Sequence, residues 1–185
     1  MQKCVSRTGG GSPAGCGVSV DERGDYQGDG LGLVDDKGRV AIPASLRATL
    51  AANAPRPDGK DGGTVIVGVH PKHKCLRAYD PAYVKILRAQ LDAREAAHTA
   101  ADGEPNYNFK RRGASGEPVP FDGSGRFIMP GFPRDYAGIG EHAFFWGTLD
   151  WIEIWDPKTL LDAADVDPVM QAACRYHCKT KGVAL

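Results

Sequence analysis

The chain has 185 residues, 42% of them apolar, which is enough for one globular domain or for two small units that share a core. Its 23 basic and 23 acidic side chains give a formal net charge of zero, so nucleic-acid binding has to come from a local patch. The five cysteines are odd in number and scattered, which is a poor disulfide framework for a secreted protein. No apolar run is long enough to span a membrane or to serve as a signal peptide, so we expect reduced thiols and a cytoplasmic protein.

The first 25 residues are rich in glycine, serine, proline and charge, and they follow neither a helical nor a strand period. This composition predicts a disordered N-terminal extension. The alternative is that translation starts downstream of Met1, because patterned sequence begins only near Tyr26.

An internal repeat organises the rest of the chain. The segments DDKGRVAIPASLR (35–47) and DGSGRFIMPGFPR (122–134) align without a gap, and each is followed by a similar pair of apolar segments at 64–81 and 142–157. The matched positions lie at one constant offset: Asp35 and Asp122, Gly38 and Gly125, Arg39 and Arg126, Pro43 and Pro130, Arg47 and Arg134. We therefore predict two copies of one structural unit.

Each copy reads as a strand, a tight turn and a second strand. The glycine of Asp-x-x-Gly can take a positive φ, as such a turn requires, and strict alternation follows it. The alternation directs four side chains to the core, namely Val40, Ile42, Phe127 and Met129, and it puts Arg126 and Ile128 on the opposite face.

Helices are predicted after each unit's second strand and between the units. Pro43 and Pro130 suit the first turns of short helices, and Leu46 and Leu50 lie on one side of the first of these. Residues 81–98 form a longer helix with one apolar stripe of Val84, Leu87 and Leu91, and residues 99–120 are predicted to be loop. The resulting division is a first domain at 28–83, a helical and loop linker at 84–113, a second domain at 114–160 and a C-terminal tail at 161–185.

The two turns carry the chemistry. In this geometry the aspartate can cap turn amides and hold the arginine that follows the glycine, and a fixed guanidinium suits phosphate or the O6 and N7 atoms of guanine. Lys37 adds charge to the first turn where the second has Ser124, so the first is expected to be the stronger DNA contact. The alternative is a salt bridge that only closes the turn, but its duplication favours a ligand common to both copies.

From Gly28 to Leu161 the sequence resembles the MraZ family, which consists of two tandem SpoVT-AbrB domains. The resemblance is carried by the duplicated Asp-x-x-Gly-Arg turn, with its apolar strand and proline, and by the segment GTLDWIEIWDP. It implies an α+β, β-dominated fold in which two swapped-hairpin repeats form one pseudo-twofold, β-barrel-like core. It also implies a ring-forming homo-oligomer that binds repeated promoter boxes in double-stranded DNA, is associated with the nucleoid, and represses its own division and cell-wall operon.

The resemblance assigns DNA contact to Asp35, Arg39, Asp122 and Arg126, which match the family's Asp-x-x-x-Arg motifs. Lys37 is predicted to join this contact through its charge, and the candidates for supplementary DNA contacts are Arg47, Arg134, Arg111 and Arg112. The chain departs from the family pattern in its N-terminal extension, in an insertion at 55–63, and in a shortened linker that lacks the composition of the usual second helix. The basic run Lys110 to Arg112 in that linker is either a further phosphate contact or a solvated loop.

Other constellations are interpreted as structural. Two His/Cys sets lack paired CxxC spacing, so no metal or other cofactor is expected: His70, His73 and Cys75, and Cys174, His177 and Cys178. The aromatic run from Phe144 to Trp155 could stack on bases, but strand alternation favours a core or a subunit interface.

We also predict no enzymatic activity and no small-molecule substrate, because the sequence has neither a phosphate loop nor a nucleophile elbow. No membrane partner is predicted, because no apolar run is long enough to span a bilayer. Two rival interpretations are an AbrB-like antitoxin that neutralises a partner protein, and a hydrolase that uses His142 or His177.

Overall fold

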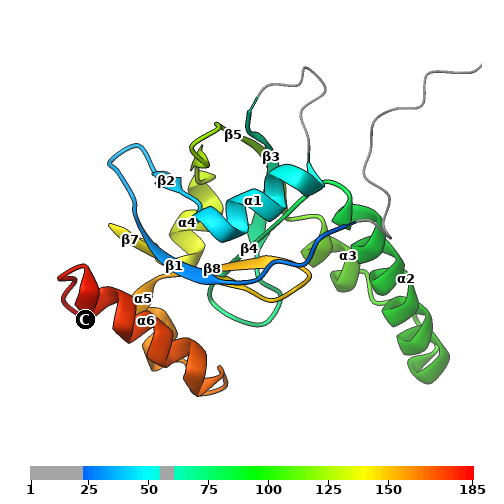
Figure 1. Ribbon diagram of the computed structural model, residues 1–185. Helices are drawn as coiled ribbons and strands as arrows, with labels where there is room; N and C mark the ends of the chain where they lie inside the picture. Colours follow the sequence, from blue (N-terminus) through cyan, green and yellow to red (C-terminus); the bar gives the residue numbers. More distant parts are fainter. Residues whose placement is uncertain (1–22, 55–60) are drawn as a thin grey trace, which may run out of the picture.

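The computed structural model describes residues 23–54 and 61–185, and it has a mixed α+β, strand-rich architecture (Figure 1). In chain order its elements are β1 (Asp29–Leu33), β2 (Arg39–Ala41), α1 (Ala44–Asn53), β3 (Gly63–Val69), β4 (Leu76–Tyr79), α2 (Tyr83–Asp102), α3 (Asn108–Gly113), β5 (Glu117–Phe121), β6 (Arg126–Ile128), α4 (Gly131–Ala137), β7 (His142–Gly147), β8 (Ile152–Trp155), α5 (Pro157–Asp162) and α6 (Pro168–Thr180). Most of the predicted extension and of the insertion, at 1–22 and 55–60, lies outside these residues.

Six strands form one antiparallel sheet in the order β1-β7-β8-β4-β3-β5, while β2 and β6 pair with each other as a separate ribbon. The corresponding strands of the two repeats are β1 and β5, β3 and β7, and β4 and β8. If each strand is replaced by its counterpart, the result is the same strand order read from the opposite edge of the sheet. The sheet is therefore built symmetrically, and strands of one repeat pair with strands of the other at both edges.

The predicted barrel-like core is wrong, because in the described part of the chain the sheet is open. Its edge strands β1 and β5 do not pair with each other. The strands that follow the turns, β2 and β6, leave the sheet and are only three residues long, since Pro43 and Pro130 follow them closely. They cannot extend the sheet far enough to close it.

The pairing registers show where the two repeats meet. In the ribbon, Val40 lies opposite Phe127, its counterpart in the other repeat. In the sheet, Arg77 of β4 lies opposite Glu153 of β8, which is again its counterpart. Each repeat thus contributes equivalent residues on both sides of an approximate twofold axis.

The main hydrophobic core lies between the sheet and the β2–β6 ribbon with its helices α1 and α4, and both repeats supply it. The predicted inward positions are confirmed, because these side chains are buried in it: Val40, Ile42, Phe127, Met129, Leu46 and Leu50. A second cluster contains Phe144 and Trp155, which alternate with the core residues Phe145 and Ile154 on β7 and β8. It therefore lies on the opposite face of the sheet, under α5 and α6.

The long helix predicted at 81–98 is confirmed as α2, and Leu87 and Leu91 of its predicted stripe pack in one cluster, but the first stripe position is wrong. Val84 is exposed, whereas Tyr83 is fully buried with Leu87 and packs against Tyr79 of β4. The helix docks where β4 ends, so Tyr83 faces the sheet. None of the helices in the described ranges is long and apolar enough to cross a membrane.

The prediction of a loop at 99–120 is wrong, and so is the prediction that the linker contains no second helix. Helix α3 packs against α2, where Lys110 forms ion pairs with Asp92 (3.2 Å) and Glu95 (2.6 Å), and β5 pairs with β3. Both elements depend on partners distant in sequence. Residues 161–185 likewise contain α6, which packs on β1 and α5.

The end of the predicted extension is fixed to the folded domain. The Arg23 guanidinium lies over the rings of Tyr26 and Tyr83, and its Nε donates to the carboxylate of Asp80 at 2.7 Å. Asp80 is fully buried and also accepts the hydroxyl of Tyr26 at 2.8 Å. Arg23, which lies within the predicted extension, therefore contacts the folded domain.

Candidate nucleic-acid interface

The first turn is closed by a network centred on Asp35. Its Oδ1 accepts the backbone amides of Lys37 (3.0 Å) and Arg39 (2.9 Å), and its Oδ2 accepts the Nε–H of Arg39 at 2.7 Å. Gly38 has a φ of 78° and donates its amide to the Asp35 carbonyl at 2.8 Å. The positive φ explains the glycine, and the carboxylate fixes the direction of the guanidinium.

The second turn repeats this network atom for atom. Asp122 accepts the amides of Ser124 and Arg126 at 2.9 Å each and the Nε–H of Arg126 at 3.0 Å. Gly125 has a φ of 77° and donates to the Asp122 carbonyl at 2.8 Å. The two turns therefore present the same chemical group in the same local frame.

These hydrogen bonds keep both carboxylates ionised. The amide and then the guanidinium of Arg39 hold the pKa of Asp35 below its usual range. The amide of Arg126 is the main cause of the lowered pKa of Asp122. Each aspartate therefore remains a charged acceptor that orients its arginine at any pH near neutrality.

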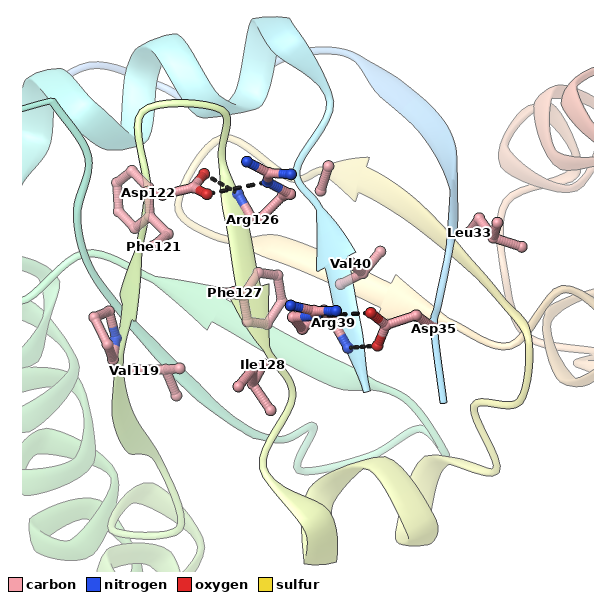
Figure 2. Close-up of a pocket in the computed structure, with 12 residues that line it drawn as sticks. Leu33, Asp35, Arg39, Val40, Val119, Phe121, Asp122, Arg126, Phe127 and Ile128 are labelled. Carbon is pink, nitrogen blue, oxygen red and sulfur yellow. Dashed lines mark hydrogen bonds and ion pairs between the residues drawn. The ribbon is translucent and has the colours of Figure 1, made fainter. Parts of the chain in front are cut away.

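Both arginines lie on one exposed face of the β2–β6 ribbon (Figure 2). Arg39 is opposite Ile128 and Arg126 is opposite Ala41, so these four side chains share the face turned away from the core. The Arg39 and Arg126 side chains are 53% and 63% exposed. Within residues 23–54 and 61–185 their Nη atoms form no hydrogen bond, so these donors remain available to a ligand.

The same face forms one side of a groove of about 750 Å³. The groove brings the residues of both turns together, with strands β1 and β5 on either side of the ribbon (Figure 2). Its lining comprises Leu33, Asp35, Arg39, Val40, Ala41, Val119, Pro120, Phe121, Asp122, Arg126, Phe127 and Ile128. Positions far apart in the sequence thus form one continuous surface.

Each turn is held by the other repeat. The amide of Ile42 donates to the carbonyl of Gly125 at 3.0 Å, and the amide of Met129 donates to the carbonyl of Gly38 at 2.9 Å. Because these two bonds are symmetric counterparts, the spacing of the two guanidinium groups is set by the backbone.

The two arginines that end the repeated segments support the turns. Arg47 donates from Nη1 to the carbonyl of Ser124 at 2.7 Å, across the repeat boundary. Arg134 donates to the carbonyls of Ile139 (3.0 Å) and Gly140 (3.1 Å). A Cβ at Gly38 would lie 3.1 Å from the Arg134 Nη1 atom, so this guanidinium packs beneath the first turn. Their positions fit a structural role better than the supplementary DNA contact predicted for them.

The other predicted supplementary residues are not brought to the groove. Arg111 and Arg112 lie on α3, where they donate to the Asn108 side chain (3.3 Å) and to the Pro71 carbonyl (3.4 Å). Lys37 is exposed in the first turn, and its counterpart Ser124 is exposed in the second. The predicted difference in charge between the two turns is therefore present at the surface.

The His/Cys sets lie in packed surroundings. Burial raises the pKa of the Cys174 thiol to about 12, and His177 pairs with Asp29 of β1. The His70 and His73 rings stack at 4.9 Å. In the part of the chain that the structure describes, no three His, Cys, Asp or Glu side chains are grouped as metal ligands would be.

The core interpretation of the aromatic run is confirmed for Phe144, Phe145 and Trp155, which are buried. Two exposed apolar side chains also line the groove, of which Ile128 was predicted to face away from the core and Leu33 was not predicted. Leu33 is 69% exposed and Ile128 is 52% exposed. In the sequence, the alternation of side chains along the strand already places Ile128 on the same face as Arg126.

Known proteins identify the family. No family model matches the chain. However, it is 30% identical over 149 residues to the transcriptional regulator MraZ of a Ruegeria species, an alignment that covers 78% of this chain and 86% of that protein. MraZ of Ruegeria pomeroyi is 31% identical over 137 residues, with 72% and 78% covered, and MraZ of Pseudomonas fluorescens is 28% identical over 149 residues, with 79% and 91% covered. These relatives are named as regulators and not as enzymes, and at this identity and coverage the chain belongs to the MraZ family of transcriptional regulators.

Proposed function

We propose that this protein is a sequence-specific regulator of transcription that reads duplex DNA with Arg39 and Arg126. The observation that carries the proposal is the pair of matching turns, which present two guanidinium groups with free Nη donors on one exposed ribbon face. The names of the relatives support the same function.

The ribbon has the shape and donors that this task needs. The major groove of B-DNA admits a two-stranded β-ribbon, and an arginine there can donate two hydrogen bonds to the O6 and N7 atoms of guanine. A planar guanidinium already held through Nε loses little freedom when its Nη donors bind, so orientation by Asp35 and Asp122 favours affinity and specificity.

A formal charge of zero gives little general attraction to DNA, so a single copy would bind weakly. We therefore propose a ring of identical subunits whose turns meet repeated promoter boxes together, because linked sites raise the effective concentration. The resemblance to MraZ supports repression of the protein's own division and cell-wall operon, and a place in the cytoplasm on the nucleoid.

The test is the double variant Arg39→Ala with Arg126→Ala, and its matched control is Arg88→Ala with Arg94→Ala, which removes two exposed charges from α2. Both variants should keep the wild-type circular dichroism spectrum. In gel shifts with the DNA upstream of the gene, the first should lose specific binding and the control should retain it. Wild-type binding should also weaken as salt rises. Retained specific binding by the Arg39/Arg126 variant would refute the assigned site.

A further inference from the structure

The two ends of the ribbon face are chemically different. Opposite Arg39 stands Ile128, a branched side chain that is 52% exposed, whereas Arg126 is opposite Ala41, the counterpart of Ile128 in the first repeat. On the ribbon face a branched apolar side chain therefore stands beside Arg39 and only a methyl group beside Arg126.

Core packing does not account for this apolar surface. Val40 and Phe127 point the other way and are buried, while Ile128 remains exposed in the groove beside a guanidinium with free Nη donors. A protein partner that covered Ile128 would also have to desolvate the Arg39 guanidinium, whose Nη donors are not bonded by Asp35. The edges of base pairs offer a better match, because the guanine acceptors and the thymine C5 methyl group are exposed in the same groove of DNA.

We propose that Ile128 contacts the C5 methyl group of a thymine adjacent to the guanine read by Arg39. The inference rests on the proposed function and adds to it a specificity-determining side chain and an asymmetric DNA word. At the other end Ala41 offers only one methyl group, so discrimination by this contact is weaker there.

Replacing thymine by deoxyuridine tests the contact, since uracil keeps the pairing edge and the O4 acceptor and lacks only the methyl group. In the promoter duplex bound by the wild-type protein, each thymine is replaced in turn and the Kd is measured by fluorescence anisotropy. One position next to a guanine should weaken binding about fourfold, the value of one buried methyl group. In Ile128→Ala the thymine and uracil duplexes should bind equally at that position, while Val84→Ala, which shortens an exposed side chain on α2, should keep the difference.

Several outcomes overturn the inference while leaving the proposed function standing: tolerance of uracil at every position, a bound box without thymine, or an unchanged thymine preference in Ile128→Ala. If Ile128→Ala also alters subunit assembly on size exclusion while that preference persists, the side chain serves a contact between copies of the chain. If the wild-type protein binds no promoter DNA at all, the proposed function itself fails.

Discussion

At the scale of single residues, the aspartates decide what the arginines can do. An isolated arginine on a surface samples many rotamers, but here the Nε atoms of Arg39 and Arg126 are bonded to carboxylates that also cap the turn. The ion pair itself is exposed and adds little stability. Its value lies in orientation, which leaves the outer edge of the guanidinium free.

Replacing one of these carboxylates by an amide tests this role. Asparagine can still accept the turn amides through its oxygen, but its nitrogen cannot accept from arginine Nε. Asp35→Asn should keep the fold and bind promoter DNA roughly tenfold more weakly, the scale of one lost charge-assisted hydrogen bond. Asp162→Asn, on an exposed position of α5, is the matched control for the charge, and affinity can be measured by anisotropy. Equal affinity in the two variants would mean that Asp35 only closes the turn.

A second residue-scale prediction concerns His70. Its pKa is lowered to about 4, mainly by burial and further by the positive charges of His73, Arg77 and Lys72. In the unfolded chain a histidine titrates near 6.5, so between these values the unfolded state binds a proton that the folded state does not. Stability should therefore fall as the solution is acidified from about pH 6.5 towards pH 4, by about 2 kcal/mol between pH 7 and pH 5.

Urea denaturation of the wild type and of His70→Gln at both pH values measures this loss. The variant should lose less stability on acidification than the wild type. Parallel losses in the wild type and His70→Gln would show that another group causes the acid sensitivity.

At the scale of elements, α6 is an integral part of the fold. Met170, Cys174 and Cys178 line one side of this helix and are buried with Phe144 and Trp155 on the outer face of the sheet. The helix is also tied to β1 by the His177–Asp29 pair and by a hydrogen bond from Lys181 to the carbonyl of Leu31. This packing covers one face of the edge strand β1.

Neighbouring substitutions on α6 separate packing from helix propensity. Met170→Ala removes a buried side chain and should lower the free energy of unfolding by about 3 kcal/mol. Val169→Ala changes an exposed position of the same turn and should alter it by less than about 0.5 kcal/mol. Chemical denaturation measures both values. Similar small effects would indicate that α6 is docked only weakly.

At the scale of the whole molecule, the two repeats are not separable units. Strand β1 pairs with β7 and β3 pairs with β5, so strands of each repeat have their hydrogen-bonding partners in the other repeat. Both repeats also contribute side chains to one core. Unfolding either half would expose the shared core, which makes the chain one cooperative unit.

Two measurements test this. The full chain should unfold in a single transition seen identically by circular dichroism and by tryptophan fluorescence. A fragment of residues 23–83 should lack a cooperative melt, because its edge strands have lost their partners and its core is incomplete. A fragment with dispersed amide resonances and its own melting transition would contradict the shared core.

The sequence by itself determined the features that depend on a few neighbouring residues. The Asp-x-x-Gly-Arg spacing predicts both turns, since the positive φ at Gly38 and Gly125 and the capping by aspartate are local. Strand alternation correctly assigns Val40, Ile42, Phe127 and Met129 to the core, and the internal repeat shows that the turns form a pair.

Only the tertiary structure decided which strands meet and what surface they form. The pairing of β2 with β6, the open sheet, the strand β5 and the helices α3 and α6 all depend on contacts between residues far apart in the chain, which local patterns do not encode. For the same reason the burial of Tyr83 in place of Val84 follows from where α2 docks and not from its own periodicity. The groove that joins Arg39, Arg126 and Ile128 exists because the two repeats pack across a shared axis, and this packing brings two charged turns onto one surface.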